Sequence, residues 1–329
     1  MREVEEDRDT TEYIGGHPPV TPIAQGLYYR GLEKHENQNL LEAKCAYLQA
    51  IKRTADLSEC HHALASVYIE EQQYTMALKS LKSALKHCTE DPSDIWEDIT
   101  VCCYHLKKTE DVFDIIAEYE FEGDYEACHT YYVVAQTLLL CLEADFAFDA
   151  YSIIEAIGLE HCEVFMIFSM ADVYNKRGKY KEALALLDFL REHPDMKDHE
   201  GYKAEVLHAY ASVYEHMGRE DVAVFLYRQA INKDPMLAKA YYELGMLYYK
   251  AFKIPELKLA HKYLYWFTEY FSPTEEDDDE TIVQRGEDIT SAETTLKHIT
   301  SLLASGKEPL DRKVLAFARP DKAQDAPIE

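Results

Sequence analysis

Apolar residues recur three and four positions apart over most of this chain, the spacing that gives a helix one buried face. Four letters, ASVY, occur at Ala65–Tyr68 and again at Ala211–Tyr214, with a near copy, ADVY, at Ala171–Tyr174. Gly and Pro are sparse, at 12 and 11 of 329 residues, so few residues interrupt such helices. The pattern predicts an all-α protein.

The repeated letters belong to a longer pattern, called the register below. It consists of a small residue, an aromatic residue, an alanine, a bulky residue and a second small residue at fixed spacings. In one copy the register reads Ala211, Tyr214, Ala223, Tyr227 and Ala230, followed by Pro235. Seven copies begin at Gly31, Ala65, Thr100, Ala135, Ala171, Ala211 and Gly245. Their spacings are 34, 35, 35, 36, 40 and 34 residues, and the copy at Thr100 keeps the register least well. The chain is therefore built from repeats.

This register resembles the tetratricopeptide repeat, a helix–turn–helix that carries W-x₂-L-G-x₂-Y, then A-x₃-F, then Pro. The first helices show LASVY, YASVY, MADVY and LGMLY, and the second helices show YTMALKSLKSAL, YKEALALLDFL and DVAVFLYRQAI. The resemblance covers residues 22–271. It implies a right-handed α-solenoid of about seven repeats, in which small residues let the two helices of a pair cross closely.

Composition divides the chain further. We expect residues 1–21 to be a flexible acidic N-terminal tail and residues 22–271 to form the solenoid. Residues 272–281 form an acidic linker, because 275–280 are six consecutive acids. Apolar spacing returns in 282–304, which we interpret as a C-terminal capping helix, and we expect 305–329 to be a flexible C-terminal tail.

Charge and cysteine usage exclude several classes of protein. The net charge is −27, with most of the excess between residues 91 and 170, which argues against direct nucleic-acid binding. The most apolar segment, 131–142, is too short to insert into a membrane. All eight cysteines lie between residues 45 and 162, with no C-x-x-C pair and no secretion signal before them. We expect reduced thiols and a cytoplasmic location, with the nucleus as the alternative.

No sequence motif indicates catalysis or the binding of a cofactor or metal. The chain has no Gly-rich phosphate loop, nucleophile elbow or H-E-x-x-H helix. Its adjacent Cys and His residues lack the loop spacing of zinc ligands. We therefore expect a non-catalytic adaptor that binds a peptide or protein segment. The alternative is a scaffold subunit built into a larger multiprotein complex.

The first helices of such a solenoid line a concave face, and this face is one candidate binding surface. Its predicted residues are His62, Ser66, Ile69, Tyr132, Gln136, Phe168, Asp172, Asn175, His208, Ser212, Glu215, Tyr242, Met246 and Tyr249. Chaperone adaptors of the family hold a terminal carboxylate with Lys, Asn and Arg at such positions. The groove positions here carry His62 and Ser66, Phe168 and Asp172, and His208 and Ser212 instead, so that function is not expected.

The second candidate is an acidic patch within the segment EDVFDIIAEYEFEGDYE, residues 110–126. The patch consists of Glu110, Asp111, Asp114, Glu118, Glu120, Glu122, Asp124 and Glu126. Aromatic residues Tyr119, Phe121 and Tyr125 alternate with the acids. An acidic surface attracts basic partners, so the patch predicts a docking site for a basic segment. The alternative is a solvated outer face that keeps the protein soluble.

Overall fold

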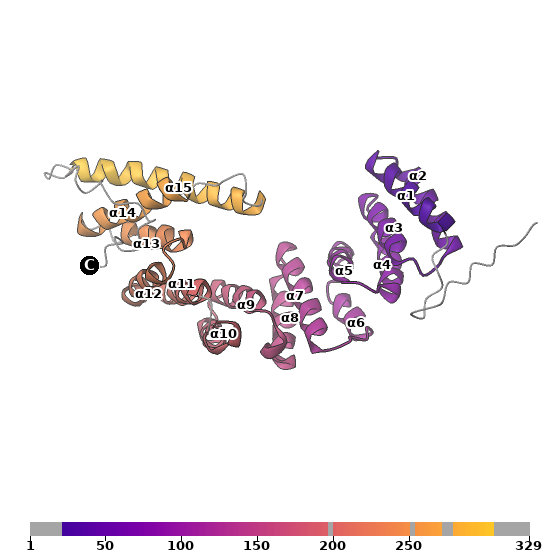
Figure 1. Cartoon of the computed structure of the whole chain (residues 1–329), viewed down its shortest axis with the longest axis horizontal. Helices are drawn as coiled ribbons and strands as arrows, with labels where there is room; N and C mark the ends of the chain where they lie inside the picture. The colour runs from indigo at the N-terminus through magenta and orange to yellow at the C-terminus, as the bar shows by residue number, and fades with distance from the viewer. Residues whose placement is uncertain (1–21, 197–199, 251–253, 272–278, 306–329) are drawn as a thin grey trace, which may run out of the picture. The chain divides into compact units, whose positions relative to one another are not determined.

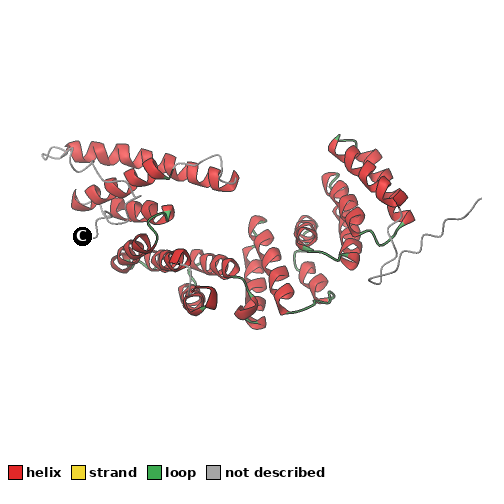
Figure 2. Cartoon of the chain, viewed as in Figure 1, coloured by secondary structure: helices red, strands yellow, loops and turns green. Residues whose placement is uncertain are grey.

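The computed structural model describes residues 22–196, 200–250, 254–271 and 279–305, where every regular element is helical (Figures 1 and 2). This part of the chain holds fifteen α-helices and two short 3-10 helices, in agreement with the predicted all-α class. The chain divides into two compact units, of which unit 1 ends at Cys162 and unit 2 begins at Glu163. Residues 1–21 and 306–329 of the predicted tails, and residues 272–278 of the predicted linker, lie outside the described residues.

Unit 1 is a stack of helix pairs. The pairs are α1 (Pro22–Glu36) with α2 (Leu40–Arg53), α3 (Ser58–Glu70) with α4 (Tyr74–His87), α5 (Ser93–His105) with α6 (Asp111–Ala117), and α7 (Asp124–Leu140) with α8 (Ala144–Ile157). The 3-10 helix η1 (Leu159–His161) follows α8. Each first helix contacts the next first helix, and α2 and α4 contact the first helix of the following pair. This is the solenoid packing that the repeats predicted.

Unit 2 is also built from helix pairs. Its pairs are α9 (Val164–Lys176) with α10 (Tyr180–Glu192), α11 (Glu200–His216) with α12 (Glu220–Lys233), and α13 (Ala238–Lys250) with α14 (Ile254–Tyr270). The 3-10 helix η2 (Pro194–Met196) lies between α10 and α11. The last helix, α15 (Asp279–Ser305), includes the whole predicted capping helix and begins inside the acid run.

The small residue of each first helix is buried where the helix pair crosses. These residues are Gly31, Ala65, Thr100, Ala135, Ala171, Ala211 and Gly245. A Cβ at Gly31 would lie 2.3 Å from Cε1 of Tyr47, and one at Gly245 would lie 2.7 Å from Cγ of Leu264. The second helix therefore approaches too closely for a larger residue, which is why the register begins with a small one.

One turn geometry recurs between the two helices of six repeats. The second residue after the first helix is left-handed, with φ between 58° and 74°, at Gln38, Gln72, Lys107, Leu142, Gly178 and Gly218. In each, backbone N–H groups donate back to the last helical turn; for example, Lys179 N–H donates to Tyr174 O at 2.9 Å. This is a Schellman cap. Gly178 and Gly218 supply the residue that usually adopts this conformation, and the other four repeats adopt the same turn without glycine.

Polar contacts join successive first helices at two fixed places. In unit 2, Nε2 of His208 on α11 lies 2.8 Å from Oε2 of Glu243 on α13. A second pair joins the same two helices about two turns further along, where Lys250 Nζ of α13 lies 2.5 Å from Glu215 Oε1 of α11. Unit 1 has corresponding contacts, with His62 of α3 paired to Asp98 of α5 at 3.0 Å. These polar contacts act together with apolar packing to hold neighbouring repeats in register.

Helix α15 takes the place of an eighth first helix. Tyr242 OH of α13 donates to Ser291 Oγ of α15 at 3.2 Å, and Tyr249 OH lies 2.6 Å from His298 Nδ1. These positions repeat the two places at which α11 contacts α13. The small residue Gly245 lies two positions after Glu243, which contacts the preceding first helix. The residue two positions after Ser291 on α15 is Glu293, which is exposed. No second helix covers Glu293 in the described chain, so a charged residue is tolerated and the stack ends there.

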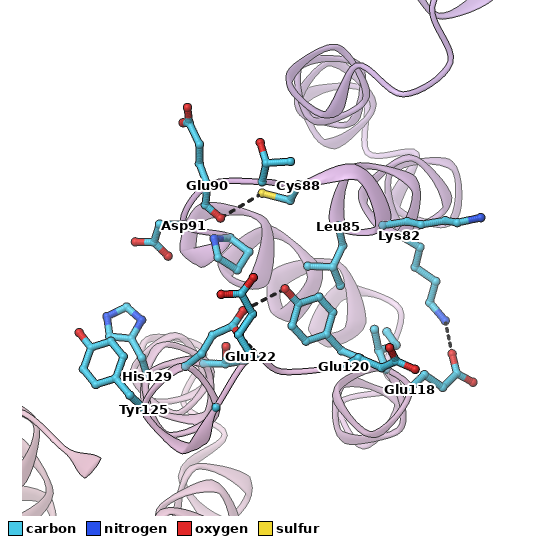
Figure 3. Close-up of a pocket in the computed structure, with 18 residues that line it drawn as sticks. Lys82, Leu85, Cys88, Glu90, Asp91, Glu118, Glu120, Glu122, Tyr125 and His129 are labelled. Atoms are coloured by element: carbon cyan, nitrogen blue, oxygen red, sulfur yellow. Dashed lines mark hydrogen bonds and ion pairs between the residues drawn. The ribbon is translucent and has the colours of Figure 1, made fainter. Parts of the chain in front are cut away.

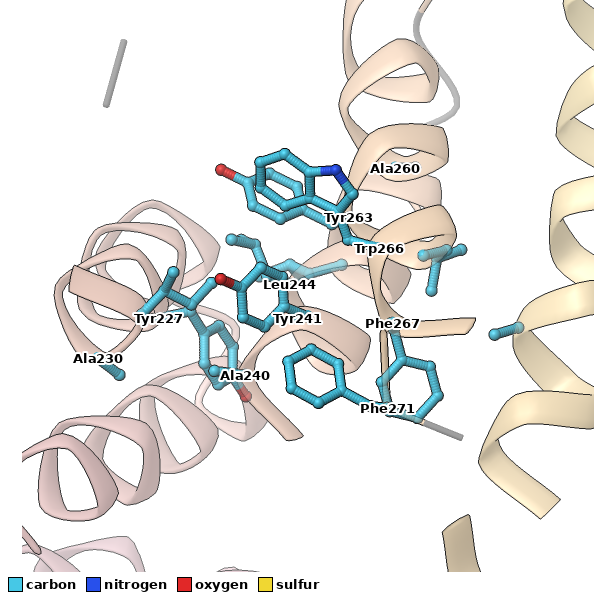
Figure 4. Packing of buried hydrophobic residues seen from close by; sticks show 14 of the residues in the cluster. Tyr227, Ala230, Ala240, Tyr241, Leu244, Ala260, Tyr263, Trp266, Phe267 and Phe271 are labelled. Atoms are coloured by element: carbon cyan, nitrogen blue, oxygen red, sulfur yellow. The ribbon is translucent and has the colours of Figure 1, made fainter. Parts of the chain in front are cut away.

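Aromatic side chains fill the space between the last repeats (Figure 4). Tyr241 of α13 is 1% exposed, and its ring lies 5.3 to 6.2 Å from the rings of Tyr263, Trp266 and Phe271. Tyr227 of α12 is fully buried in the same cluster. These rings account for part of the high tyrosine content. Among the described helices, none combines the length and the apolar character needed to cross a bilayer.

Candidate functional site: an acidic cleft in unit 1

A cleft of about 1230 Å³ opens in unit 1 beside the loop before α5 and the loop before α7 (Figure 3). Its walls come from the end of α4, the end of α6, the first turns of α7 and these two loops. The acids that line it are Glu90, Asp91, Glu118, Glu120, Glu122 and Glu126. Only two lysines line it, Lys82 and Lys86. The cleft is therefore strongly anionic.

The short α6 makes room for this cleft. It has 7 residues, whereas the other second helices have at least 13. Acids follow α6 directly at Glu118, Glu120 and Glu122, and carboxylates at a helix C-terminus oppose the helix dipole. The chain therefore leaves the helix early and runs as a loop until Gly123, after which α7 begins.

Tyr119 and Glu126 hold this acidic loop in place. The Tyr119 ring packs edge-on against Trp96, with centroids 5.5 Å apart. Tyr119 OH donates to Glu126 Oε1 at 3.0 Å, and the backbone N–H of Glu122 donates to Glu126 Oε2 at 2.7 Å. Burial, followed by the bond to the Glu126 carboxylate, raises the pKa of Tyr119 to about 12. The hydroxyl therefore stays protonated and keeps donating at neutral pH.

The remaining carboxylates of the loop are available to a ligand. Glu118 lies 3.9 Å from Lys82, and both side chains are well exposed. Glu120 and Glu122 are exposed, and no described lysine, arginine or histidine pairs with either side chain. Tyr125 is 51% exposed and stacks with His129, with centroids 6.1 Å apart. Carboxylates beside exposed rings suit a lysine or arginine side chain.

The structure divides the predicted acidic patch into two groups. Glu118, Glu120, Glu122 and Glu126 line the cleft, whereas Glu110, Asp111, Asp114 and Asp124 do not. Two of the latter have other partners, since Asp111 lies 3.6 Å from Lys108 and Asp124 lies 3.5 Å from His161. Sequence reasoning missed Glu90 and Asp91, because only the packing of consecutive loops brings them to the same cleft.

Many of the predicted concave-face residues contact a neighbouring helix. His62, His208 and Glu215 form the ion pairs between first helices described above, and Tyr242 and Tyr249 contact α15. Asn175 Nδ2 donates to Ser212 Oγ at 3.1 Å, and Thr295 Oγ1 donates to Met246 Sδ at 3.9 Å. Gln136 Nε2 donates to Tyr151 OH within its own helix pair at 2.9 Å. These side chains thus have structural roles that the sequence did not indicate.

The other concave-face residues lie nearer to solvent. Asp172 is exposed and pairs with Lys176 on its own helix at 2.6 Å. Ser66 Oγ donates to the backbone carbonyl of His62 at 3.2 Å. Ile69, Tyr132 and Phe168 are half-buried. In the described residues, no three His, Cys, Asp or Glu side chains are grouped to hold a metal ion.

Comparison with known proteins gives a family and a set of similar structures. The family model described as the tetratricopeptide repeat matches residues 204–235, which lie in α11 and α12 and the first residues after them. No curated protein sequence matches the chain. A tetratricopeptide repeat protein from Parabacteroides merdae is 15% identical, with 82% of this chain and 100% of that chain covered and a TM-score of 0.39.

Two further solved structures are similar at the same level. YrrB, described as a TPR protein with an unusual peptide-binding site, is 13% identical, with 66% of this chain and 89% of that one covered and a TM-score of 0.30. The TPR2AB domain of yeast Sti1, described in complex with pHSP90, is 14% identical, with 84% and 98% covered and a TM-score of 0.30.

The matched repeat has the same construction as the pairs before and after it. A buried small residue, Ala211, lies on its first helix, a Schellman cap lies at Gly218, and Tyr227 fills the space beside the next pair. The first two features recur from α1 to α10 at the spacing of the sequence register. Residues 204–235 therefore form a tetratricopeptide repeat, and the helix pairs from α1 to α10 share its construction.

Proposed function

We propose that this chain is a non-catalytic protein-interaction module that holds a basic segment of a partner protein in the acidic cleft of unit 1. The observation that carries the proposal is the cleft itself, in which six acids and two lysines line one concavity. The Glu120 and Glu122 carboxylates are exposed there on a loop that Tyr119 and Glu126 hold in place. A fixed anionic surface attracts a basic segment and loses little freedom on binding it.

The cleft supports this function better than the concave face does. Side chains such as His208 and Asn175 already pair with the next repeat, so a ligand there would have to replace those contacts. The cleft carboxylates Glu120 and Glu122 have no such contact to lose among the described residues. The concave face stays a prediction, and its residues provide a comparison for the experiment.

A charge-matched pair of variants tests the proposal. Glu120→Lys with Glu122→Lys changes the cleft, and Glu110→Lys with Asp114→Lys makes the same change in net charge outside it. The probe is a fluorescent oligo-arginine peptide, with a neutral Gly-Ser peptide for comparison, followed by anisotropy at low and high salt. We expect the cleft variant to lose roughly tenfold or more in affinity at low salt, since it reverses two close charges.

The control variant decides between a local site and general attraction. We expect it to bind almost as well as the wild type, because its altered residues lie outside the cleft. Equal losses in the two variants would contradict a site in the cleft, as would equal binding of the neutral peptide. Circular dichroism of both variants confirms that the helices are intact.

A further inference from the structure

Two buried cysteines in unit 1 lie against each other. Cys128 is in the second turn of α7 and is fully buried, and Cys162 directly follows η1 and is 6% exposed. A hydrogen bond between the two thiols is the largest cause of the lowered pKa of Cys128 and of the raised pKa of Cys162. They are 34 residues apart in sequence, so the contact closes a loop that contains the whole of α8.

The turn after α8 creates this contact. Gly158 has φ of +137°, and a Cβ there would lie 2.8 Å from the Glu160 carboxylate, so the turn needs glycine. The turn directs η1 back towards α7, where the Cys128 thiol also lies 4.0 Å from Gly158 O. His161 then lies 3.5 Å from Asp124 in the first turn of α7. These two contacts hold the segment from Gly158 to His161, which Cys162 directly follows, against α7.

The other six cysteines have no such partner thiol. Cys102 and Cys103 are neighbours on α5, but adjacent residues of a helix point about 100° apart. Burial raises the pKa of Cys60 and of Cys102 to about 12 and that of Cys103 to about 11. In contrast, the hydrogen bond from Cys162 lowers the pKa of Cys128, which favours its thiolate.

We propose that Cys128 and Cys162 are a redox-active thiol pair that hydrogen peroxide converts to an intrachain disulfide, tying η1 to α7. The Cys128 thiolate attacks one peroxide oxygen and breaks the O–O bond. The released hydroxide takes a proton and becomes water, and Cys128 becomes a sulfenic acid. The Cys162 sulfur then attacks the Cys128 sulfur, and the displaced hydroxide takes the Cys162 proton to form a second water. Two thiols are oxidised and one peroxide is reduced.

This inference is independent of the proposed function, because neither cysteine lines the cleft. Peroxide is small, and a three-residue 3-10 helix at the end of unit 1 opens more readily than a long α-helix. Oxidation would close the loop between the two cysteines covalently and so hinder that opening.

Peptide mapping of the full chain tests the pair. Cleavage after glutamate separates residues 127–143, which contain Cys128 and Cys141, from residues 161–163, which contain Cys162. After peroxide treatment and without reductant, we expect these two peptides to be joined, with the loss of two hydrogen atoms. We expect the joined product in Cys141→Ser, its absence in Cys128→Ser and Cys162→Ser, and its reversal by dithiothreitol.

Exposed Cys45 reports whether the oxidant acted. Oxidation of Cys45 while the two peptides stay unlinked would overturn the proposal. Loss of the joined product in Cys141→Ser would overturn it too, because the disulfide would then belong to Cys141. Circular dichroism of each variant before treatment shows that it is folded.

Discussion

Two glycines of α1 provide a matched test of the close helix crossing. A Cβ at Gly31 would meet the ring of Tyr47 at 2.3 Å and 2.5 Å, whereas a Cβ at Gly26 would meet nothing within 4 Å. Both glycines lie in the same helix, so replacement by alanine gains a similar helix propensity of about 1 kcal/mol. The two substitutions therefore differ mainly in the contact with Tyr47.

The contact decides the sign of the effect. Tyr47 is fully buried, so its ring has little room to move away from a new methyl group. Overpacking of this kind costs about 1–3 kcal/mol, and the short distance places Gly31→Ala at the upper end. After the gain in helix propensity, we expect Gly31→Ala to destabilise the α1–α2 pair by about 2 kcal/mol. We expect Gly26→Ala to stabilise it by up to about 1 kcal/mol.

Hydrogen exchange with mass spectrometry measures this locally, which suits a repeat protein that need not unfold in one step. We expect amides of α1 and α2 to exchange about 30-fold faster in Gly31→Ala, and up to about fivefold slower in Gly26→Ala. Amides of α13 and α14 serve as an internal reference. Slower exchange in both variants would refute the argument that the small residue is required by the helix crossing.

Two further predictions concern stability. Burial raises the pKa of Glu243, but His208 and Tyr227 outweigh it, so the pKa lies below its ordinary value of 4.5. We therefore expect the wild type to have a larger free energy of unfolding in urea than Glu243→Gln. This difference is full above pH 4.5 and shrinks as the pH falls further. A difference that grew at lower pH would contradict the pairing. Leu142 is left-handed, with φ of 63°, and glycine adopts this conformation without steric strain. We expect Leu142→Gly to stabilise the α7–α8 pair by about 0.5 kcal/mol, measured by hydrogen exchange. Leu140→Gly, equally exposed but helical, should destabilise it by up to about 1 kcal/mol, and equal effects would refute the conformational argument.

The repeat register could be predicted because it depends on local constraints. Each helix pair must cross closely, so a small residue such as Ala65 or Ala211 recurs at one place and can be recognised without a structure. The Schellman caps were harder to recognise, since glycine, the usual residue at this position, occurs only at Gly178 and Gly218. At Leu142 the turn is imposed by the packing of both helices, and the residue tolerates the strain.

The candidate sites depended more on tertiary structure. The acids of residues 110–126 stood out in the sequence, but their division between cleft and outer surface follows from the early end of α6. Glu90 joins the cleft from an earlier loop, and no pattern in its own segment indicates this. Likewise, the sequence placed His208 on a binding face, whereas the first helix of the next pair, α13, supplies Glu243 as its partner.

The sequence by itself determined the helices, the repeat period and the presence of a final capping helix, because these depend on residues close together in the chain. Only the tertiary structure decided which polar side chains are already paired. It showed α15 in the position of an eighth first helix, with exposed Glu293 where every repeat has a small buried residue. It also placed Cys128 against Cys162 across the whole of α8. Contacts of this kind depend on which surfaces meet when the helices stack, and a periodic sequence does not record that.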